Sequence, residues 1–336
     1  MCDCPNPARA RRILLAGATG YIGRVVAAEL LRRGHSVIAP VRDEGGRQRP
    51  DAAIVEDALA GVMRRVVELT DAVQTAKVLD GLEVDATISC LASRSGIAAD
   101  AWAVDHRANA NLLVAAKRAG AKQFVLLSAI CVQRPRLAFQ HAKLAFEAAL
   151  MDSGIDYTVV RPTAFFKSLS GQVGRVRQGK PFLLFGDGRQ TACKPIGERD
   201  LARFLADCLE DPASRNQMLP IGGPGAAITP REQGQLLFEL TGQKSRFRQV
   251  PVAVFDAALA SLTPLAKLSP RFAAKAELAR IGRYYATESM LLWNESKREY
   301  DADATPSYGE ETLRDFYVRV LEEGLAGQSL GGQALF

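Results

Sequence analysis

The chain has 336 residues, of which 48% are hydrophobic and 24% charged, and its net charge is +6. No apolar run approaches the ~18 residues of a membrane-spanning helix, and the start, MCDCP, lacks the apolar core of a secretory signal, so we expect a cytoplasmic protein of one large or two modest domains. The basic residues are scattered rather than gathered in a stripe with aromatic residues, so we expect no nucleic-acid partner; an acidic small molecule or a weak peripheral membrane contact explains the charge better.

The first half of the chain alternates short apolar segments with amphipathic ones. The apolar segments predict strands at 13–16, 36–41, 65–69, 86–90, 123–127 and 157–160. The amphipathic segments predict helices at 24–33, 71–82, 100–119 and 138–153, with a less clear short helix at 51–61. This alternation predicts an α/β fold of the Rossmann type, with a doubly wound parallel sheet.

The most informative motif is Gly17-Ala18-Thr19-Gly20-Tyr21-Ile22-Gly23, between the first strand and the first helix. Glycines let the backbone turn tightly and approach a pyrophosphate, and the helix N-terminus offers it N–H groups and a partial positive charge. The spacing G-x-x-G-x-x-G resembles the short-chain dehydrogenase variant of the dinucleotide fingerprint. The residues predicted to bind the dinucleotide here are Gly17, Thr19, Gly20, Tyr21, Ile22 and Gly23.

The residues after the second strand indicate which dinucleotide binds. An NAD enzyme usually places an acid there to bind the ribose 2′-hydroxyl, whereas this chain has Arg42 followed by Asp43. Arg42 can bind a 2′-phosphate, and Arg24, directly after the last glycine, can assist it. The sequence therefore favours NADPH over NADH; the alternative is that both arginines are solvated surface residues.

Small residues follow the fourth strand, in the stretch Cys90-Leu91-Ala92-Ser93. In a doubly wound fold this loop faces the ligand crevice at the carboxyl edge of the sheet. We expect Leu91, Ala92 and Ser93 to lie beside the cofactor; the alternative is an ordinary turn between strand and helix.

The candidate catalytic residues are Ser128, which follows the fifth strand, and Lys143, within Phe139-Gln140-His141-Ala142-Lys143. Residues four apart share one face of a helix. The short-chain dehydrogenases that this pattern resembles carry Tyr-x-x-x-Lys here: the lysine holds the nicotinamide ribose and lowers the tyrosine pKa, and the phenol transfers the carbonyl proton. Phe139 cannot transfer a proton, so the usual alcohol–ketone chemistry is not expected.

The alternation ends after Pro162. We predict strands at 181–185 and 218–221, and helices at 172–179, 199–209, 230–241, 252–262, 272–288 and 310–322. Residues 1–165 are therefore expected to form the NADPH-binding Rossmann domain, with residues 1–11 disordered. Residues 166–336 are expected to form mostly a smaller substrate-binding lobe, with some segments packing back on the first domain.

Several stretches resemble the divinyl chlorophyllide (protochlorophyllide) 8-vinyl-reductase family, an atypical short-chain dehydrogenase group. They are LSAICVQRP at 127–135, FQHAKL at 139–144, VRPTAFFKSL at 160–169, FGDG at 185–188, ACKPI at 192–196 and LPIGGPG at 219–225. The resemblance runs from about residue 12 to residue 322. The family also carries phenylalanine before the lysine and uses NADPH to reduce the 8-vinyl group of a chlorophyll precursor to ethyl. The resemblance implies that activity here, and the absence of the plant members' long transit peptide fits a bacterial cytoplasmic protein.

The missing tyrosine agrees with this chemistry. A vinyl group on a conjugated macrocycle accepts hydride at its terminal carbon, and the negative charge spreads into the ring system, so no localised oxyanion needs a phenol beside it. A proton must still reach the inner vinyl carbon. Lys143 acting through the ribose hydroxyl and water, Cys131, and solvent are the candidate donors, and the sequence does not decide between them.

The implied substrate, a magnesium tetrapyrrole with a propionate, needs an apolar slot with cations at its rim. Either Phe165 or Phe166 can stack on a ring, or both can be core between the lobes; Lys167 or Lys194 can bind the carboxylate. The residues expected to contact the substrate are Cys131, Phe139, Phe166, Lys167 and Lys194, and those expected to reach the cofactor after the sixth strand are Pro162, Thr163 and Phe165.

Two other functions stay open at this point. One is a non-catalytic NADPH-binding sensor or assembly factor, since such proteins share this fold and often lose the tyrosine. The other is a double-bond reductase that resembles the isoflavone reductases. We expect no metal site, because Cys2 and Cys4 have no histidine-rich partner region, and we expect the other four cysteines to be free buried thiols.

Overall fold

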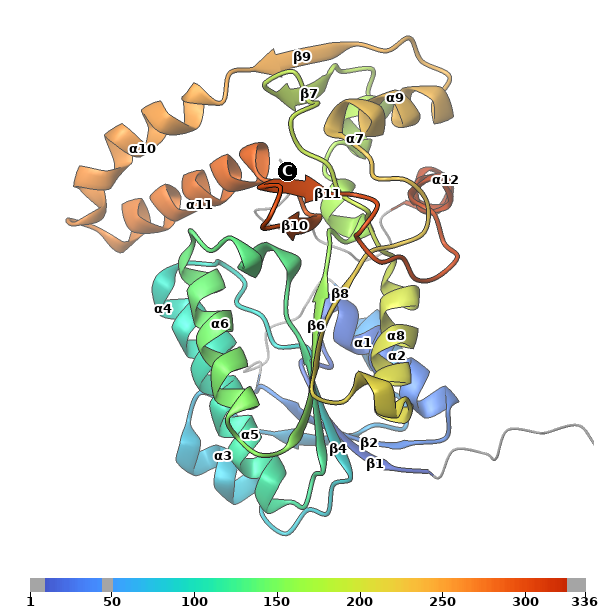
Figure 1. Cartoon of the computed structure of the whole chain (residues 1–336), viewed down its shortest axis with the longest axis vertical. Coiled ribbons are helices and arrows are strands. Elements are labelled where there is room, and N and C mark those ends of the chain that lie inside the picture. The colour runs from blue at the N-terminus through green and yellow to red at the C-terminus, as the bar shows by residue number, and fades with distance from the viewer. Residues whose placement is uncertain (1–9, 44–50, 325–336) are drawn as a thin grey trace, which may run out of the picture.

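The fold is built around one parallel sheet, shown in Figure 1 for a computed structural model that describes residues 10–43 and 51–324. The sheet has seven strands in the order β3-β2-β1-β4-β5-β6-β8, and neighbouring strands are parallel throughout it. The strands are β1 (Arg12–Ala16), β2 (Ser36–Val41), β3 (Met63–Val66), β4 (Ala86–Ser89), β5 (Gln123–Leu127), β6 (Asp156–Pro162) and β8 (Gln217–Ile221). The predicted Rossmann-type, doubly wound α/β fold is confirmed.

Helices cover both faces of this sheet, as the apolar strands require. In β1, Ile13 and Leu15 join one buried cluster while Leu14 and Ala16 join the other, because successive side chains point to opposite faces. One face carries α1 (Tyr21–Arg32), α2 (Ala52–Ala58) and α8 (Glu198–Glu210); the other carries α3 (Ala72–Leu79), α5 (Asn109–Arg118) and α6 (Ala138–Met151).

Two predictions in the first half need correction. The third strand was expected at 65–69 and lies at Met63–Val66, because its place is set by pairing with β2, where Val41 lies opposite Val66. The buried Val67 and Leu69, which suggested a strand, join the apolar cluster beneath α3 and α5 instead. The helix expected at 100–119 consists of α4 (Ala98–Ala101), a π-helix η1 (Trp102–Ala108) and α5.

Two segments from the second half of the chain belong to the layers of the first. Helix α8 packs beside α1, with Leu201, Leu205 and Leu209 fully buried, and β8 pairs with β6 at the edge of the sheet. The remaining second-half elements form a smaller lobe at the carboxyl edge of the sheet (Figure 1). This edge, where the predicted site residues gather, therefore faces the second lobe.

The smaller lobe has a separate apolar core, which contains Phe166, Phe182 and Phe316. Its elements are α7 (Val173–Arg177), β7 (Phe182–Phe185), α9 (Pro230–Leu240), β9 (Phe247–Val250), α10 (Ala253–Ala266), α11 (Pro270–Thr287), β10 (Leu292–Asn294), β11 (Glu299–Asp301) and α12 (Leu313–Glu323). The strands β9, β10 and β11 were not predicted. They are only three or four residues long, too short to show an alternating pattern, so only their partners, β7 for β9 and each other for β10 and β11, make them strands.

Helices α10 and α11 form a hairpin that projects from the body of the molecule (Figure 1). We name residues 252–287 the arm. No residue of α10 is buried, although the helix is largely apolar. Among the described residues, no helix is both long and apolar enough to cross a bilayer.

The described cysteines are free, with Cys131 and Cys208 buried and Cys90 and Cys193 partly accessible. The residues from 10 to 43 and from 51 to 324 contain no cluster of three or more His, Cys, Asp or Glu that could hold a metal ion. Cys2 and Cys4 lie outside the described residues, as do most of the 11 residues expected to be disordered. Arg11, however, is tied down: its backbone N–H donates to His35 Nδ1 at 3.3 Å and its guanidinium to Leu209 O at 2.5 Å.

Candidate active site

The glycine-rich turn forms a close-packed cradle at the N-terminus of α1. A Cβ on Gly17 would lie 2.7 Å from Cys90 O, and a Cβ on Gly23 would lie 2.1 Å from Gly17 O, so neither position admits a side chain. Gly17 also has a φ of +79°, which only glycine adopts without strain. No side chain caps α1 at Gly20, and its first turn holds no acid. The turn therefore fits a dinucleotide pyrophosphate on the backbone N–H groups of the helix.

A cluster of charged side chains lies beside this turn. The Tyr21 hydroxyl donates to Glu198 Oε2 at 2.6 Å, and Lys167 Nζ lies 4.8 Å from the centre of the Tyr21 ring. Burial and the nearby charge of Arg24 lower the pKa of Lys167. The structure thus places Lys167 beside the glycine turn, where a pyrophosphate binds, rather than at a rim remote from the cofactor.

The two arginines expected at the 2′-phosphate differ in their surroundings. Arg24 is 6% exposed and its Nη1 lies 3.4 Å from Asp51 Oδ2. Its guanidinium is therefore buried beside the glycine turn. Arg42 follows β2 and is exposed. A buried cation on α1 and an accessible one after β2 suit a phosphate on the adenosine ribose.

The most informative contact of the site was not predicted: Lys143 Nζ lies 3.0 Å from Asp105 Oδ1. Both residues are nearly inaccessible, at 9% and 2% exposure. Asp105 belongs to the π-helix η1, and its carboxylate also lies 3.4 Å from the backbone nitrogen of Ser93 in the loop after β4. The carboxylate of Asp105 therefore contacts both the loop expected at the cofactor and the lysine expected to be catalytic. The sequence signal was weak, because only a helix was expected there.

Ser128 occupies a different hydrogen-bond system from Lys143. Its hydroxyl donates to Glu147, and Glu147 also pairs with Arg161. Glu147 stands four residues after Lys143 on α6 and is 1% exposed. This buried triad joins the carboxyl ends of β5 and β6 to α6, so the structure gives Ser128 a partner that fixes these strands to the helix.

Cys131 and Phe139 lie where the second lobe contacts α6. Cys131 is in the 3-10 helix η2 (Ile130–Gln133) and shares an apolar cluster with Tyr284 and Met290, against which Phe139 packs. Gln140 Nε2 donates to Cys131 O at 3.0 Å, which ties η2 to α6. Burial raises the pKa of the Cys131 thiol. Phe139 is therefore part of the wall between α6 and α11.

The two phenylalanines after β6 have different surroundings: Phe166 lies in the core of the smaller lobe, and Phe165 lies beside the sheet. Phe166 is fully buried in the core of the smaller lobe, and its ring centre lies 5.4 Å from that of Phe316. The expectation that Phe166 contacts substrate is thus corrected: packing within the lobe takes up its ring. Phe165 is half-buried and bridges to Ile196, beside the sheet.

The stretches 192–196 and 219–225, both quoted above for the family resemblance, contact each other at the carboxyl edge of the sheet. A Cβ on Gly223 would lie 2.0 Å from Pro195 O, and one on Gly222 would lie 2.9 Å from Lys194 O. Thr163, directly after the buried Pro162, donates its hydroxyl to Lys194 O. Lys194 Nζ donates to Thr305 O at 3.0 Å, so this ammonium has a backbone partner.

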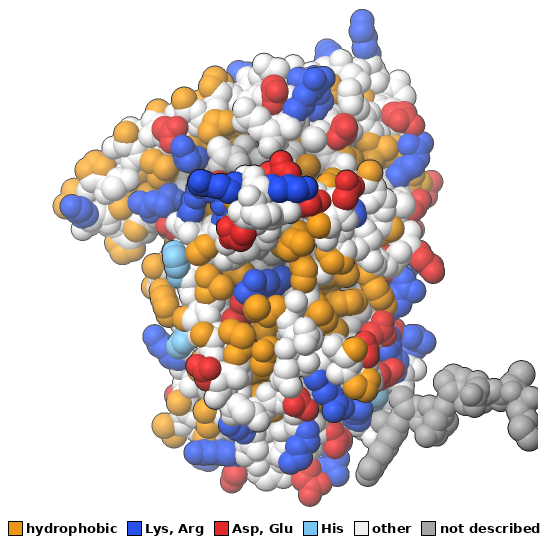
Figure 2. Space-filling model, viewed as in Figure 1, with side chains coloured by type: hydrophobic (Ala, Val, Ile, Leu, Met, Phe, Trp, Pro, Cys, Tyr) orange, Lys and Arg blue, Asp and Glu red, His pale blue; other side chains and the backbone are white. Residues whose placement is uncertain are grey.

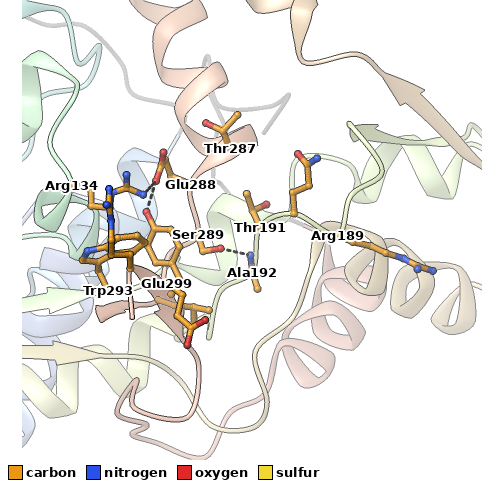
Figure 3. A pocket seen from close by; sticks show the side chains of 13 residues that line it. Arg134, Arg189, Thr191, Ala192, Thr287, Glu288, Ser289, Trp293 and Glu299 are labelled. Carbon is orange, nitrogen blue, oxygen red and sulfur yellow. Dashed lines mark hydrogen bonds and ion pairs between the residues drawn. The ribbon is translucent and has the colours of Figure 1, made fainter. Parts of the chain in front are cut away.

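A pocket of about 470 Å³ opens in the smaller lobe (Figure 3). In it the Arg134 guanidinium lies 4.1 Å from the centre of the Trp293 ring, and its Nη1 lies 2.9 Å from Glu288 Oε2. Gln133 joins the pocket to η2, because its side chain donates to Leu291 O at 2.6 Å and accepts from the backbone of Trp293 at 2.8 Å. The pocket residues thus anchor the segment that carries Cys131.

Comparison with known proteins identifies the family. Residues 17–212 match the NAD(P)H-binding family. The chain is 51% identical over 332 residues to divinyl chlorophyllide a 8-vinyl-reductase, chloroplastic, of Cucumis sativus, with 96% of this chain and 79% of that protein covered. This chain belongs to the divinyl chlorophyllide a 8-vinyl-reductase family.

The chain is also similar, at lower identity, to an assembly factor and to a reductase of known structure. The photosystem II assembly factor Ycf39 of a Synechocystis strain is 26% identical over 251 residues, which is 72% of each chain. The structure of the leucoanthocyanidin reductase–NADPH complex of Vitis vinifera aligns with a TM-score of 0.67 at 17% identity, covering 93% of this chain and 100% of that one. The last similarity shows the fold alone, whereas the divinyl chlorophyllide a 8-vinyl-reductases match at about 50% identity over 96% or more of this chain.

Proposed function

We propose that this protein is an NADPH-dependent oxidoreductase that reduces the 8-vinyl group of divinyl chlorophyllide a, or of a related magnesium tetrapyrrole, to ethyl in chlorophyll or bacteriochlorophyll synthesis. The observation that carries the proposal is the 51% identity to a divinyl chlorophyllide a 8-vinyl-reductase along 96% of the chain. A non-catalytic assembly factor is not favoured, because Ycf39 is only 26% identical over a shorter stretch. An isoflavone-reductase-like activity is not favoured either, since that match is 29% identical.

The residues of the glycine turn would hold NADPH by its pyrophosphate, with Arg24 and Arg42 beside the 2′-phosphate. When bound, NADPH supplies the hydride. Lys143 is fixed by Asp105 at 3.0 Å in a nearly inaccessible position. In this proposal its ammonium holds the nicotinamide ribose. In this proposal residues 1–165 form most of the cofactor-binding domain and residues 166–336 form most of the substrate-binding lobe.

The experiment that tests this function is incubation of the purified protein with divinyl chlorophyllide a and NADPH, followed through the Soret absorption band. The expected result is a monovinyl product formed with matching consumption of NADPH. NADH in place of NADPH is expected to support a much slower reaction. Binding of NADPH without any pigment reduction would favour the sensor alternative.

Lys194 is our proposal for the cation that meets the substrate propionate. Its ammonium is half-buried at the carboxyl edge of the sheet, and Thr305 O, a neutral partner, leaves its charge uncompensated there. Lys194→Met is expected to raise the KM for the free acid, and to raise it less for the methyl ester, which has no charge to pair. Equal effects on acid and ester would contradict this role, and Lys167→Met serves as the comparison from the glycine turn.

We also propose that the arm makes a peripheral contact with an anionic membrane surface on the cytoplasmic side. Leu268 at its tip is 80% exposed, and the neighbouring Lys267 and Arg271 are exposed as well. Figure 2 shows hydrophobic side chains along the projecting arm with basic ones among them. Apolar side chains that enter the interface and cations that meet lipid phosphates are the two components of interfacial binding. Such a contact would bring the site close to an amphiphilic pigment.

A further inference from the structure

Lys167 differs from the other two lysines of the site, because its charge has no polar partner in the protein. The ammonium of Lys143 has a carboxylate partner at 3.0 Å, and that of Lys194 has a backbone carbonyl at 3.0 Å. Within the described part of the chain, the half-buried ammonium of Lys167 has neither an ion pair nor a hydrogen bond and lies over the Tyr21 ring, 4.8 Å from its centre. A partly desolvated cation of this kind is stabilised when a ligand supplies the missing acceptor.

The backbone that carries Lys167 is held in place by its neighbours. Lys167 belongs to the 3-10 helix η3 (Phe166–Leu169), which follows β6. The side chain of Phe166 is fully buried in the core of the smaller lobe, and its backbone N–H donates to Ile196 O at 3.2 Å. The Ser170 hydroxyl donates to Lys167 O at 2.7 Å. The smaller lobe therefore presents this cation to the first domain from a fixed position.

The contact with Tyr21 places the Lys167 ammonium at the N-terminus of α1. Tyr21 is the first residue of this helix and part of the glycine-rich turn. Its hydroxyl donates to Glu198 at 2.6 Å, and Glu198 also pairs with Arg319 at 3.7 Å. Arg24, whose guanidinium lies 6.0 Å from the centre of the same ring, has a carboxylate partner at 3.4 Å. Of these three cations, Lys167 is the one whose charge no described carboxylate pairs with.

We propose that Lys167 binds the pyrophosphate of NADPH from the smaller lobe. This inference rests on the proposed function for its cofactor, and it makes Lys167 a cofactor-binding residue rather than the substrate-binding residue that the sequence suggested. The helix N-terminus offers the negatively charged pyrophosphate N–H groups and a partial charge, and Lys167 adds a full one. A phosphate oxygen is a stronger partner for an ammonium than an aromatic face, so the phosphate competes successfully with the Tyr21 ring. Bound NADPH then joins the two lobes.

The test measures dinucleotide binding by isothermal titration without pigment, so it does not depend on vinyl reduction. NADPH and NADH share the pyrophosphate and differ in the 2′-phosphate. Lys167→Met is therefore expected to weaken the binding of both dinucleotides, each by about tenfold, as loss of one charge-assisted hydrogen bond does. Lys167→Arg keeps the charge and is expected to stay within about threefold of the wild type.

Lys180→Met is the matched control, because it removes the same charge from an exposed position of the smaller lobe. Its affinity for both dinucleotides is expected to equal that of the wild type. The melting temperature of the cofactor-free protein is expected to change little in Lys167→Met, because a cation over an aromatic ring contributes little at a half-exposed site. The rise in melting temperature on addition of NADPH is expected to be smaller in Lys167→Met than in the wild type.

Unchanged affinity for both dinucleotides in Lys167→Met would overturn the proposal, and a raised KM for the free-acid pigment beside it would assign Lys167 to the propionate. Weaker binding of NADPH alone would assign Lys167 to the 2′-phosphate and overturn the proposal too. Equal losses in Lys167→Met and Lys167→Arg, with lower melting temperatures of the cofactor-free proteins, would assign the residue to packing at the turn and have the same consequence. If the wild type binds NADPH but reduces no vinyl group, the proposed function fails, while the binding measurements still decide the role of Lys167.

Discussion

The glycine turn before α1 and the arm formed by α10 and α11 differ in almost every packing property. At the turn, a single added methyl group on Gly23 would lie 2.1 Å from a carbonyl oxygen. On the arm, α10 buries no residue, and Leu268 between the helices is 80% exposed. The close-packed turn is shaped by contacts within the chain, while the arm has an apolar surface that the chain itself leaves uncovered. Cofactor binding should therefore be sensitive to the smallest change at the turn, and membrane contact should respond gradually to changes on the arm.

The largest effect is expected from Gly23→Ala. The added Cβ displaces the turn from α1, and overpacking of this kind costs roughly 1–3 kcal/mol, which at the upper end weakens NADPH binding by about 10²-fold. Isothermal titration with NADPH measures it. Gly34→Ala at the other end of α1 is the control: its φ of +80° makes the substitution strained, but nothing lies within 4 Å of the new Cβ. Gly34→Ala is expected to lower stability by about 1 kcal/mol and to leave NADPH affinity unchanged.

Lys143→Met is expected to lower kcat/KM for vinyl reduction by about 10²-fold, because we propose that Lys143 holds the nicotinamide ribose. It also removes the partner of the buried Asp105, so the melting temperature has to be measured beside the kinetics. Phe139→Leu is the matched change on the same helix face and is expected to cost only what altered packing costs. Near-normal turnover in Lys143→Met would contradict the catalytic assignment.

Arg42→Ala is expected to weaken NADPH binding by about 10- to 100-fold and to leave NADH binding nearly unchanged. The estimate comes from the roughly 1.5–3 kcal/mol of a charge-assisted hydrogen bond. Parallel titrations with the two dinucleotides measure it. Arg32, an exposed arginine that pairs with Glu29 on the outer side of α1, gives the control variant Arg32→Ala. Equal losses for both dinucleotides would show that Arg42 does not read the 2′-phosphate.

The smallest effect is expected on the arm. Leu268→Ser is expected to weaken binding to phosphatidylglycerol-containing vesicles, measured by sedimentation, by about fivefold, or about 1 kcal/mol, which is less than the roughly 1.5–3 kcal/mol that full burial of a leucine contributes. Val73→Ser on α3 is the control, since Val73 is 78% exposed in the other domain. Binding should weaken as salt is raised and be lower with phosphatidylcholine alone. Undiminished binding of Leu268→Ser would move any membrane contact away from the arm.

The sequence predicted the elements whose own pattern specifies them. Strands β2 and β5 were placed without error, because both are apolar on successive residues and bounded by helix-ending glycines. Strands β9, β10 and β11 were missed, because they are three or four residues long and exist only through pairing. Phe166 was expected at the substrate, but its ring lies in the core of the smaller lobe. The sequence pattern of an aromatic residue after a strand is the same whether its ring lies in a substrate site or in the core of a lobe.

By itself the sequence determined the cofactor turn, the lysine and the missing tyrosine, because these depend on residues close together in the chain, where glycine geometry and helical spacing are local. The tertiary structure decided which groups surround them. Asp105 reaches Lys143 from a π-helix, and the Tyr284 hydroxyl donates to Cys131 O from an arm that follows more than a hundred residues later. No local pattern encodes such contacts, because they form only when distant segments pack together: η1 against α6 within the first domain, and α11 against η2 between the lobes.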